Sequence, residues 1–223
     1  MSADWKLFLI RHAQSANNAK PDSERVPDPG ITELGVEQSK LLASFIHRFE
    51  PTLLYCSPFL RSLQTLKPSA SALGLTPIIR QDLFEQGGCH RGFETGKRFA
   101  EPGMTRRELE THYSGWELDP RITEHGWNPL KEYETTSQAR LRAHEVRKWF
   151  DHEPRHSTHR VAMMIHADFK VRLLESFLGI EDLDSHVAEP INTSISCLIK
   201  SNGRWQLDFW NHFHHLPDHL VSS

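Results

Sequence analysis

Four side chains that can carry positive charge follow apolar segments of the sequence. Arg11 and His12 come directly after the apolar run 7–10, Arg61 lies one helical turn beyond a second run, and His166 ends a third. A pocket built from these groups is costly unless a dianion fills it, and phosphate is the obvious candidate. Arg pairs bidentately with phosphate oxygens. Histidine adds a possible nucleophile, because its unperturbed pKa of ~6.5 leaves a neutral nitrogen near neutrality.

These residues depend on the segments that hold them, and the hydrophobic periodicity predicts strands that alternate with helices. Thr32 is expected to cap one helix, and Ser57-Pro58 is expected to cap and begin the next. We expect strands at 7–10, 52–56, 76–79, 160–166, 194–200 and 204–210 and helices at 33–49, about 57–73, 105–112, 137–150 and 168–179.

This alternation implies an α/β fold, with α/β/α layers around a mostly parallel central sheet and a C-terminal antiparallel hairpin across the turn 201–203. We interpret residues 1–223 as a single domain and residues 86–133, whose periodicity is weak, as an inserted lid region. Because ligands bind beyond the carboxyl ends of parallel strands, the four cationic residues should converge there.

Composition restricts the partners. A formal net charge of -3 argues against nucleic acid or an anionic membrane as the main partner. No apolar stretch approaches the ~20 residues of a membrane span, and the N-terminus lacks signal-peptide features, so we expect a cytoplasmic protein. Cys56, Cys89 and Cys197 lack the spacing of a disulfide framework or a zinc knuckle. No oligomeric state is indicated.

Five ordered motifs carry a family resemblance. They are RHAQSANN at 11–18, ITELGVEQS at 31–39, CSPFLRSLQT at 56–65, LFE at 83–85 and MIHADF at 164–169. In this order they resemble the histidine phosphatase superfamily, also called phosphoglycerate-mutase-like. The correspondence touches residues 7–85 and 160–216, which is most of the chain apart from the insertion.

The resemblance implies a role for each matching residue. His12 would be the nucleophile that becomes phosphorylated, and Glu85 the acid that protonates the leaving oxygen and later activates water. Phosphoryl oxygens would be held by Arg11, Arg61 and His166. The resemblance implies neither a cofactor nor a metal.

Two further positions belong to the expected substrate-binding set. Asn18 matches an asparagine that contacts phosphate in the family, although it is also compatible with a turn residue, as is Asn17. Ala167 stands where the family commonly has glycine after the second histidine, and Ala13 likewise replaces the glycine after the first. Alanine is tolerated at both positions if φ is negative.

Several residues are compatible with two different roles. Glu94 and Glu101 are alternative acids to Glu85, while Asn192 and Thr193 are equally suited to ordering the backbone and to touching substrate. The basic residues of the insertion fit a solvated surface as well as a contact with a second anionic group of the substrate: Arg91, Lys97, Arg98, Arg106 and Arg107. Trp116 and Trp127 fit packing as well as stacking on a ligand.

The C-terminal tail is rich in histidine, which raises the alternative of a zinc site formed by His212, His214, His215 and His219. Zinc sites need converging ligands, and the tail offers only Asp218 as an acidic partner, so an ordinary structural role is favoured.

The favoured function is metal-independent hydrolysis of a phosphate monoester of a small metabolite through phosphorylated His12. One alternative is a cofactor-dependent phosphoglycerate mutase. Such mutases have a longer stretch with Trp and Asn after the first motif, and the segment 16–30 does not match it. Another is a non-catalytic module that binds a phosphorylated ligand, but binding alone needs neither His12 nor Glu85. The substrate is not indicated.

Overall fold

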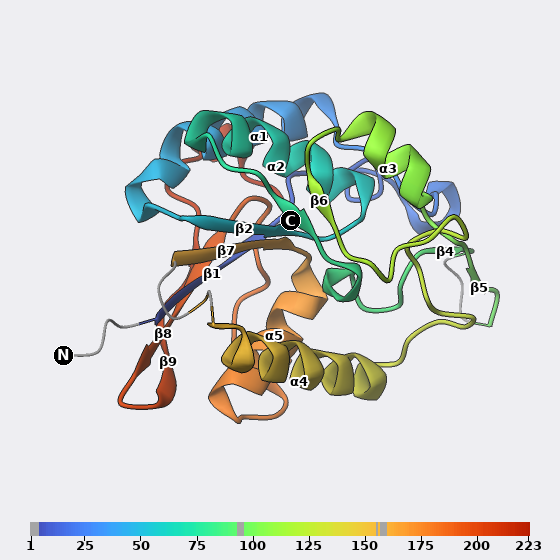
Figure 1. Cartoon of the computed structure of the whole chain (residues 1–223). Coiled ribbons are helices and arrows are strands. Elements are labelled where there is room, and N and C mark those ends of the chain that lie inside the picture. The colour runs from blue at the N-terminus through green and yellow to red at the C-terminus, as the bar shows by residue number, and fades with distance from the viewer. Residues whose placement is uncertain (1–4, 93–95, 155, 157–159) are drawn as a thin grey trace.

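The computed structural model describes residues 5–92, 96–154, 156 and 160–223 (Figure 1). Within this part of the chain, a seven-stranded sheet has the order β6-β3-β2-β7-β1-β8-β9. Its strands are β1 (Trp5–Arg11), β2 (Leu53–Cys56), β3 (Ile78–Ile79), β6 (Glu117–Leu118), β7 (Arg160–Ile165), β8 (Ile195–Ser201) and β9 (Arg204–His212). The strands from β6 to β1 pair in parallel, and β8 and β9 add antiparallel pairs.

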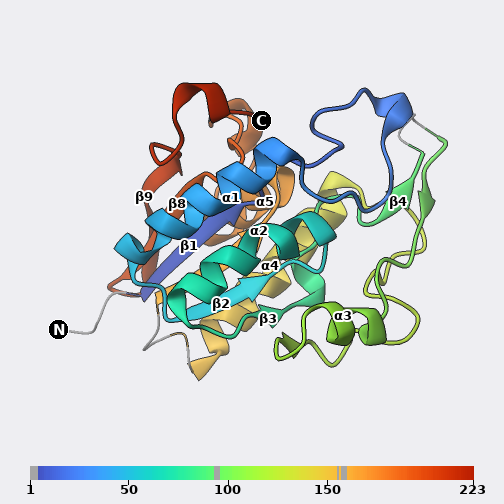
Figure 2. The same ribbon diagram turned by 90° about the horizontal axis from the view of Figure 1, so that it is seen from above.

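Helices cover both faces of this sheet. Figures 1 and 2 show α1 (Glu33–Phe45) and α2 (Leu60–Leu73) on one face and α4 (Thr136–His152) and α5 (Ala167–Leu178) on the other. Because the central strands are covered on both sides, they are continuous apolar runs rather than alternating ones. Residues 7–10 of β1 and 161–165 of β7 are buried accordingly. The expected three-layer α/β fold is confirmed.

The helix ends follow local side-chain chemistry. Thr32 caps α1 by accepting a hydrogen bond from the Gly35 amide at 3.0 Å, as expected. Thr135 and Gln138 form a capping box at the start of α4. Short 3-10 helices at Asp22–Glu24, Ile46–Phe49, Gln81–Leu83, Leu183–Ser185 and Asp218–Leu220 connect the main elements.

The expected start of the second helix is wrong by two residues. α2 begins at Leu60, and its N-cap residue is Phe59, which has no side-chain cap. Ser57 is instead buried, with its hydroxyl 2.6 Å from Nε2 of His166, the residue that follows β7. A Ser-Pro pair after a strand predicts a cap, but only the backbone angles decide whether the turn that follows is helical.

The insertion is more structured than the sequence predicts. Besides α3 (Arg106–His112), it contains the antiparallel pair β4 (His90–Arg91) and β5 (Phe99–Ala100), and it supplies β6, which extends the main sheet beside β3. Trp127 is fully buried and packs on Phe59, with ring centroids 4.5 Å apart. The insertion therefore shares the hydrophobic core of the parallel sheet.

Two expectations from composition concern cysteines and membranes. The three cysteines are buried and free. Over the ranges that the structure describes, no helix has the length and apolar content required to cross a membrane.

Candidate active site

A cavity of about 240 Å³ opens at the carboxyl end of the parallel strands. Three of the expected cationic or nucleophilic residues line it, namely Arg11, His12 and Arg61, and so does Glu85. The remaining wall comes from the segment after β1, from the residue before α2 and from the insertion: Ser15, Asn17, Asn18, Asp22, Arg25, Pro27, Phe59, Gln86, Gly88, His90, Arg98 and Tyr133.

The imidazole of His12 is held in one tautomer. Its Nδ1 lies 2.7 Å from the carbonyl oxygen of Ala13, and a carbonyl oxygen only accepts hydrogen bonds, so Nδ1 carries the proton. Nε2 therefore presents its lone pair, which accepts a hydrogen bond from Nε of Arg61 at 3.2 Å. Burial lowers the pKa of His12 well below its usual value, and the charges of Arg61 and Arg11 lower it further. The ring is neutral at physiological pH.

The two arginines are buried close to His12. Arg61 packs its guanidinium over the Phe59 ring, 3.9 Å from the centroid. Arg11 donates to the carbonyl oxygen of Pro190, while its Nε has no hydrogen-bond partner among the described residues. Burial lowers the pKa of both guanidinium groups. Arginine remains charged under such shifts, so the cavity has positive charge with unfilled hydrogen-bonding capacity.

His166 lies behind His12 rather than on the cavity wall. It is fully buried, and the two imidazole rings are 5.1 Å apart. Its Nε2 is 2.6 Å from the hydroxyl oxygen of Ser57, whereas its Nδ1 is buried without a partner in the described part of the chain. Burial first, and then Arg61, lowers its pKa well below the usual range. Ser57 thus orients this ring.

Glu85 lines the cavity and is hydrogen-bonded to the first turn of α5. Its Oε1 accepts hydrogen bonds from the amides of Phe169 at 2.9 Å and Gln86 at 2.8 Å. The N-cap residue of α5, His166, provides no side-chain cap, so Glu85 satisfies a free amide of the first turn instead. Burial raises the pKa of Glu85 to about 7, and the neighbouring Asp168 carboxylate adds to this rise.

A further carboxylate lies near these cationic groups. Asp28, which the sequence did not single out, accepts a hydrogen bond from the Leu60 amide at 2.9 Å and acts on Arg61 electrostatically. Burial raises its pKa to about 6. No motif marks Asp28, since it reaches the site from a loop that precedes α1.

Asn18 and Ala167 occupy different positions relative to the cavity. Asn18 lines it, and its side-chain oxygen accepts hydrogen bonds from the Ser15 amide and hydroxyl at 3.0 and 2.9 Å. Ala167 begins α5 and, like His166, is not part of the lining formed by the described residues. Neither Ala13 nor Ala167 has a positive φ, so alanine fits both positions without strain.

Comparison with known proteins identifies the family. The family model of the histidine phosphatase superfamily (branch 1) matches residues 7–212 of the chain. The chain belongs to the histidine phosphatase superfamily. The family resemblance seen in the five motifs is confirmed.

Curated relatives of this histidine phosphatase match it over a limited segment. Phosphoserine phosphatase 1 of Hydrogenobacter thermophilus is 36% identical over 77 residues, which cover 34% of this chain and 36% of that protein. A probable phosphatase of Schizosaccharomyces pombe is 31% identical over 81 residues, which cover 36% of this chain and 39% of that protein. The chain thus aligns with well under half the length of these relatives.

Solved structures resemble it over almost the whole chain. A mycobacterial glucosyl-3-phosphoglycerate phosphatase has a TM-score of 0.63 at 20% identity, covering 93% of this chain and 99% of the other. A phosphoserine phosphatase from Entamoeba histolytica, in complex with 3-phosphoglyceric acid, has a TM-score of 0.64 at 16% identity, covering 95% and 99%. At these identities the likeness establishes the fold.

Of the two alternative acids, Glu101 is described by the structure, and it does not line the histidine phosphatase cavity. Glu101 forms an ion pair with Arg91 at 2.7 Å and lines a separate hollow with Asp28 and Cys89. Glu94 lies outside the described residues. Of the candidates that the structure describes, Glu85 is the one on the cavity wall.

Asn192 and Thr193 order the backbone of the nucleophile. The Asn192 side-chain amide donates to the carbonyl oxygen of His12 at 3.0 Å, and the Thr193 amide donates to the same oxygen at 3.2 Å. Thr193 holds a φ of 59°, a strained value for a β-branched residue. Asn17 also has a backbone role, because its side chain bonds both polar backbone atoms of Val26.

The tail histidines make contacts within the fold. Nε2 of His215 lies 3.0 Å from the Thr193 hydroxyl, and the rings of His212 and His215 stack on Phe45. Among the residues that the structure describes, no group of three or more His, Cys, Asp or Glu side chains is placed to hold a metal ion.

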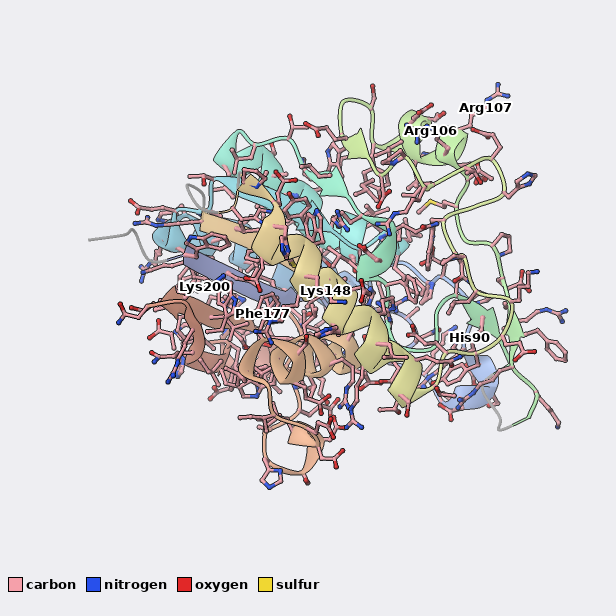
Figure 3. All side chains as sticks on the ribbon, turned by 60° about the horizontal axis from the view of Figure 1, so that its bottom comes forward. His90, Arg106, Arg107, Lys148, Phe177 and Lys200 are labelled. Carbon is pink, nitrogen blue, oxygen red and sulfur yellow. The ribbon has the colours of Figure 1, made fainter. Side chains whose placement is uncertain are left out.

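The basic residues of the insertion separate into two groups. Arg98 lines the cavity, whereas Arg91 pairs with Glu101, and Arg106 pairs with Glu110 at 2.9 Å. Figure 3 shows Arg106 and Arg107 on α3, apart from His90 of β4. Trp127 serves packing, as does Trp116 against Tyr113. Tyr133 and Gln86 line the cavity but carry no motif that sequence reasoning could use.

Proposed function

We propose that this histidine phosphatase hydrolyses phosphate monoesters of a small metabolite through a phosphohistidine on His12. The observation that carries the proposal is the orientation of His12. Its Nδ1 proton is engaged by the Ala13 carbonyl, so Nε2 is the unprotonated ring nitrogen of a residue that lines the cavity with Arg11 and Glu85. The hydrogen bond that Arg61 donates to Nε2 would pass to a phosphoryl oxygen when substrate binds.

In the first step, Nε2 of His12 attacks phosphorus and the ester P–O bond breaks. The Glu85 carboxyl group gives its proton to the leaving alkoxide, and a pKa of about 7 suits it to that role near neutral pH. The Arg11 and Arg61 guanidinium groups and the buried His166 would stabilise the charge on the phosphoryl oxygens, which supplies the electrostatic part of catalysis.

In the second step, water attacks phosphorus and the P–N bond to His12 breaks. The Glu85 carboxylate formed in the first step takes a proton from that water. Inorganic phosphate is released, and both His12 and Glu85 return to their starting protonation states. The step needs no group beyond those that line or support the cavity. The names of the curated relatives, phosphoserine phosphatase 1 and a probable phosphatase, support a monoesterase.

Rapid acid-free quenching with labelled substrate tests the proposal. The wild type should yield a phosphoenzyme that is labile in acid and maps to His12, and His12→Ala should yield none while keeping its fold. Release of inorganic phosphate without added bisphosphoglycerate would distinguish hydrolysis from the mutase reaction. A label mapped to serine or cysteine would overturn the mechanism.

A further inference from the structure

The cavity carries more positive charge than one phosphoryl group requires. Four arginines line it, against the two carboxylates of Asp22 and Glu85. Arg25 is already paired, because its guanidinium lies 2.7 Å from the Asp22 carboxylate and its Nε donates to the Asn17 carbonyl. Arg11 and Arg61 lie beside His12, where the proposed function places the phosphoryl group. Arg98 is therefore the arginine of this lining whose charge has neither a carboxylate partner among the described residues nor a place at the reacting phosphoryl group.

Arg98 has unfilled hydrogen-bonding capacity. Its Nε is buried and has no hydrogen-bond partner, and no ion pair joins the guanidinium to a carboxylate among the residues that the structure describes. A buried donor without a partner is unfavourable by itself, since it has lost its water without replacement. An anionic oxygen brought by a ligand would satisfy it.

The guanidinium of Arg98 is held in place by the ring of Tyr133. It lies over the Tyr133 ring, 4.0 Å from the centroid. Tyr133 in turn packs against Gly87, where an added Cβ would come within 2.3 Å of the ring, and makes an edge contact with His90 at 5.1 Å. Gly87 has a φ of 94°, which favours glycine. Because this stacking orients Arg98 before a ligand arrives, little entropy is lost on binding.

Arg98 lines the same cavity as His12 and Arg61, so one ligand can contact all three residues. Burial lowers the pKa of His90, and Arg98 and Arg61 each lower it further, so the charges of both arginines act on His90. Burial raises the pKa of Tyr133, which Arg98 opposes and Glu85 reinforces. The cavity volume of about 240 Å³ is below the ~300–1,000 Å³ of pockets for drug-sized ligands, so a small ligand can span both ends.

We propose that Arg98, seated on Tyr133, is a specificity-determining residue that selects phosphate monoesters carrying a second anionic group. The inference rests on the proposed function in placing the reacting phosphoryl group at His12. The second group is a carboxylate or a further phosphate, since a guanidinium pairs bidentately with either.

Matched ligands that differ in the second group test this inference. The probes are 3-phosphoglycerate, glycerol 1,3-bisphosphate and glycerol 3-phosphate, which share a three-carbon chain. Calorimetric titration of His12→Asn measures binding without turnover. We expect the two doubly anionic probes, or one of them, to bind more tightly than glycerol 3-phosphate. Adding Arg98→Gln should reduce that preference about tenfold or more, the size expected for a hydrogen-bonded charge.

Arg107→Gln is the matched control. It removes the same charge from the same insertion, but Arg107 is exposed and extends outward from α3 (Figure 3). It should preserve the binding preference. Arg98→Lys keeps the charge without the fork and should fall between wild type and Arg98→Gln.

Two outcomes would overturn the inference: no preference for a second anionic group in His12→Asn, or an equal loss of preference in Arg98→Gln and Arg107→Gln. Turnover assays of the otherwise unaltered enzyme separate this from the proposed function. A binding preference that depends on Arg98, in an enzyme that hydrolyses none of the probes or other monoesters, would refute the hydrolase proposal and leave the Arg98 subsite standing.

Discussion

The carboxylate of Glu85 accepts a hydrogen bond from the backbone amide of Phe169 at 2.9 Å, in the first turn of α5. This contact links two motifs that are far apart in the chain, LFE and MIHADF. It also fixes where the proposed acid stands relative to His166, the residue immediately before the helix. Although amide donors favour the carboxylate, burial outweighs them and keeps the pKa of Glu85 near 7.

The pH dependence should report this group. An acid must be protonated when the alkoxide leaves, so kcat/KM for an alkyl phosphate should fall as pH rises through about 7, the pKa of Glu85. The His12 pKa is lowered well below its usual value, so loss of neutral His12 should appear only at a lower pH. Glu85→Gln should abolish the alkaline decline and slow the reaction by about 10²–10⁴-fold, as is typical of general acids.

The leaving group provides the control for that prediction. p-Nitrophenyl phosphate needs little protonation of its leaving oxygen, so Glu85→Gln should slow it much less than an alkyl phosphate. The phosphate group of each substrate titrates in the same way with the wild type and with Glu85→Gln, so it does not affect the ratio of their rates. Equal losses on the two substrates would show that Glu85 supports the site without donating a proton.

Binding of inorganic anions should depend on Arg61. Vanadate or phosphate should raise the melting temperature, because a ligand that binds only the folded state stabilises it by about 2.7 kcal/mol at 100 times its Kd. Arg61→Ala should lose most of this shift, whereas Arg61→Lys should keep part of it, since lysine carries the charge but not the planar fork. An undiminished shift in Arg61→Ala, measured by differential scanning calorimetry, would place the anion elsewhere.

Much of the fold follows from the apolar runs, for a physical reason. β1 and β7 are covered on both faces, so their residues are uniformly apolar and easy to recognise. Polar residues that directly follow such strands must stand at one edge of the sheet, which is how Arg11, His12 and His166 could be placed together. Two-residue strands such as β6 have no periodicity, and the sequence could not reveal that the insertion extends the sheet.

The walls of the site were less predictable. Arg98 and Tyr133 line the cavity from loops, and Asp28 lies near Arg61 on another loop, so the positions of all three depend on tertiary packing rather than on local pattern. Arg98 was one of several basic residues in the insertion, and it differs from Arg91 in lining the cavity and in having no ion partner among the described residues. Ser57 was recognised, but its partner is His166 rather than a helix amide.

The backbone of the nucleophile depends on a clasp formed by Asn192. Its side-chain amide donates to the His12 carbonyl at 3.0 Å, and its side-chain oxygen accepts from the Ser222 hydroxyl at 3.0 Å. Gln38 bonds the same hydroxyl at 2.9 Å, so the tail and α1 both support the clasp. Asn192 is fully buried, and water cannot replace the lost donor without entering the core.

Asn192→Ala should therefore lower the free energy of unfolding by about 1–3 kcal/mol, the usual effect of leaving a buried polar group unsatisfied. The His12 carbonyl would keep only the hydrogen bond from the Thr193 amide, so the backbone of the nucleophile would be held less firmly, and kcat should fall together with stability while KM for substrate changes little. Ser222→Ala removes only the far end of the clasp and should have a smaller effect on both quantities. Urea unfolding and steady-state kinetics on the three proteins provide the measurement. A loss of stability in Asn192→Ala with unchanged kcat would limit Asn192 to a structural role, because the alignment of His12 would then not depend on it.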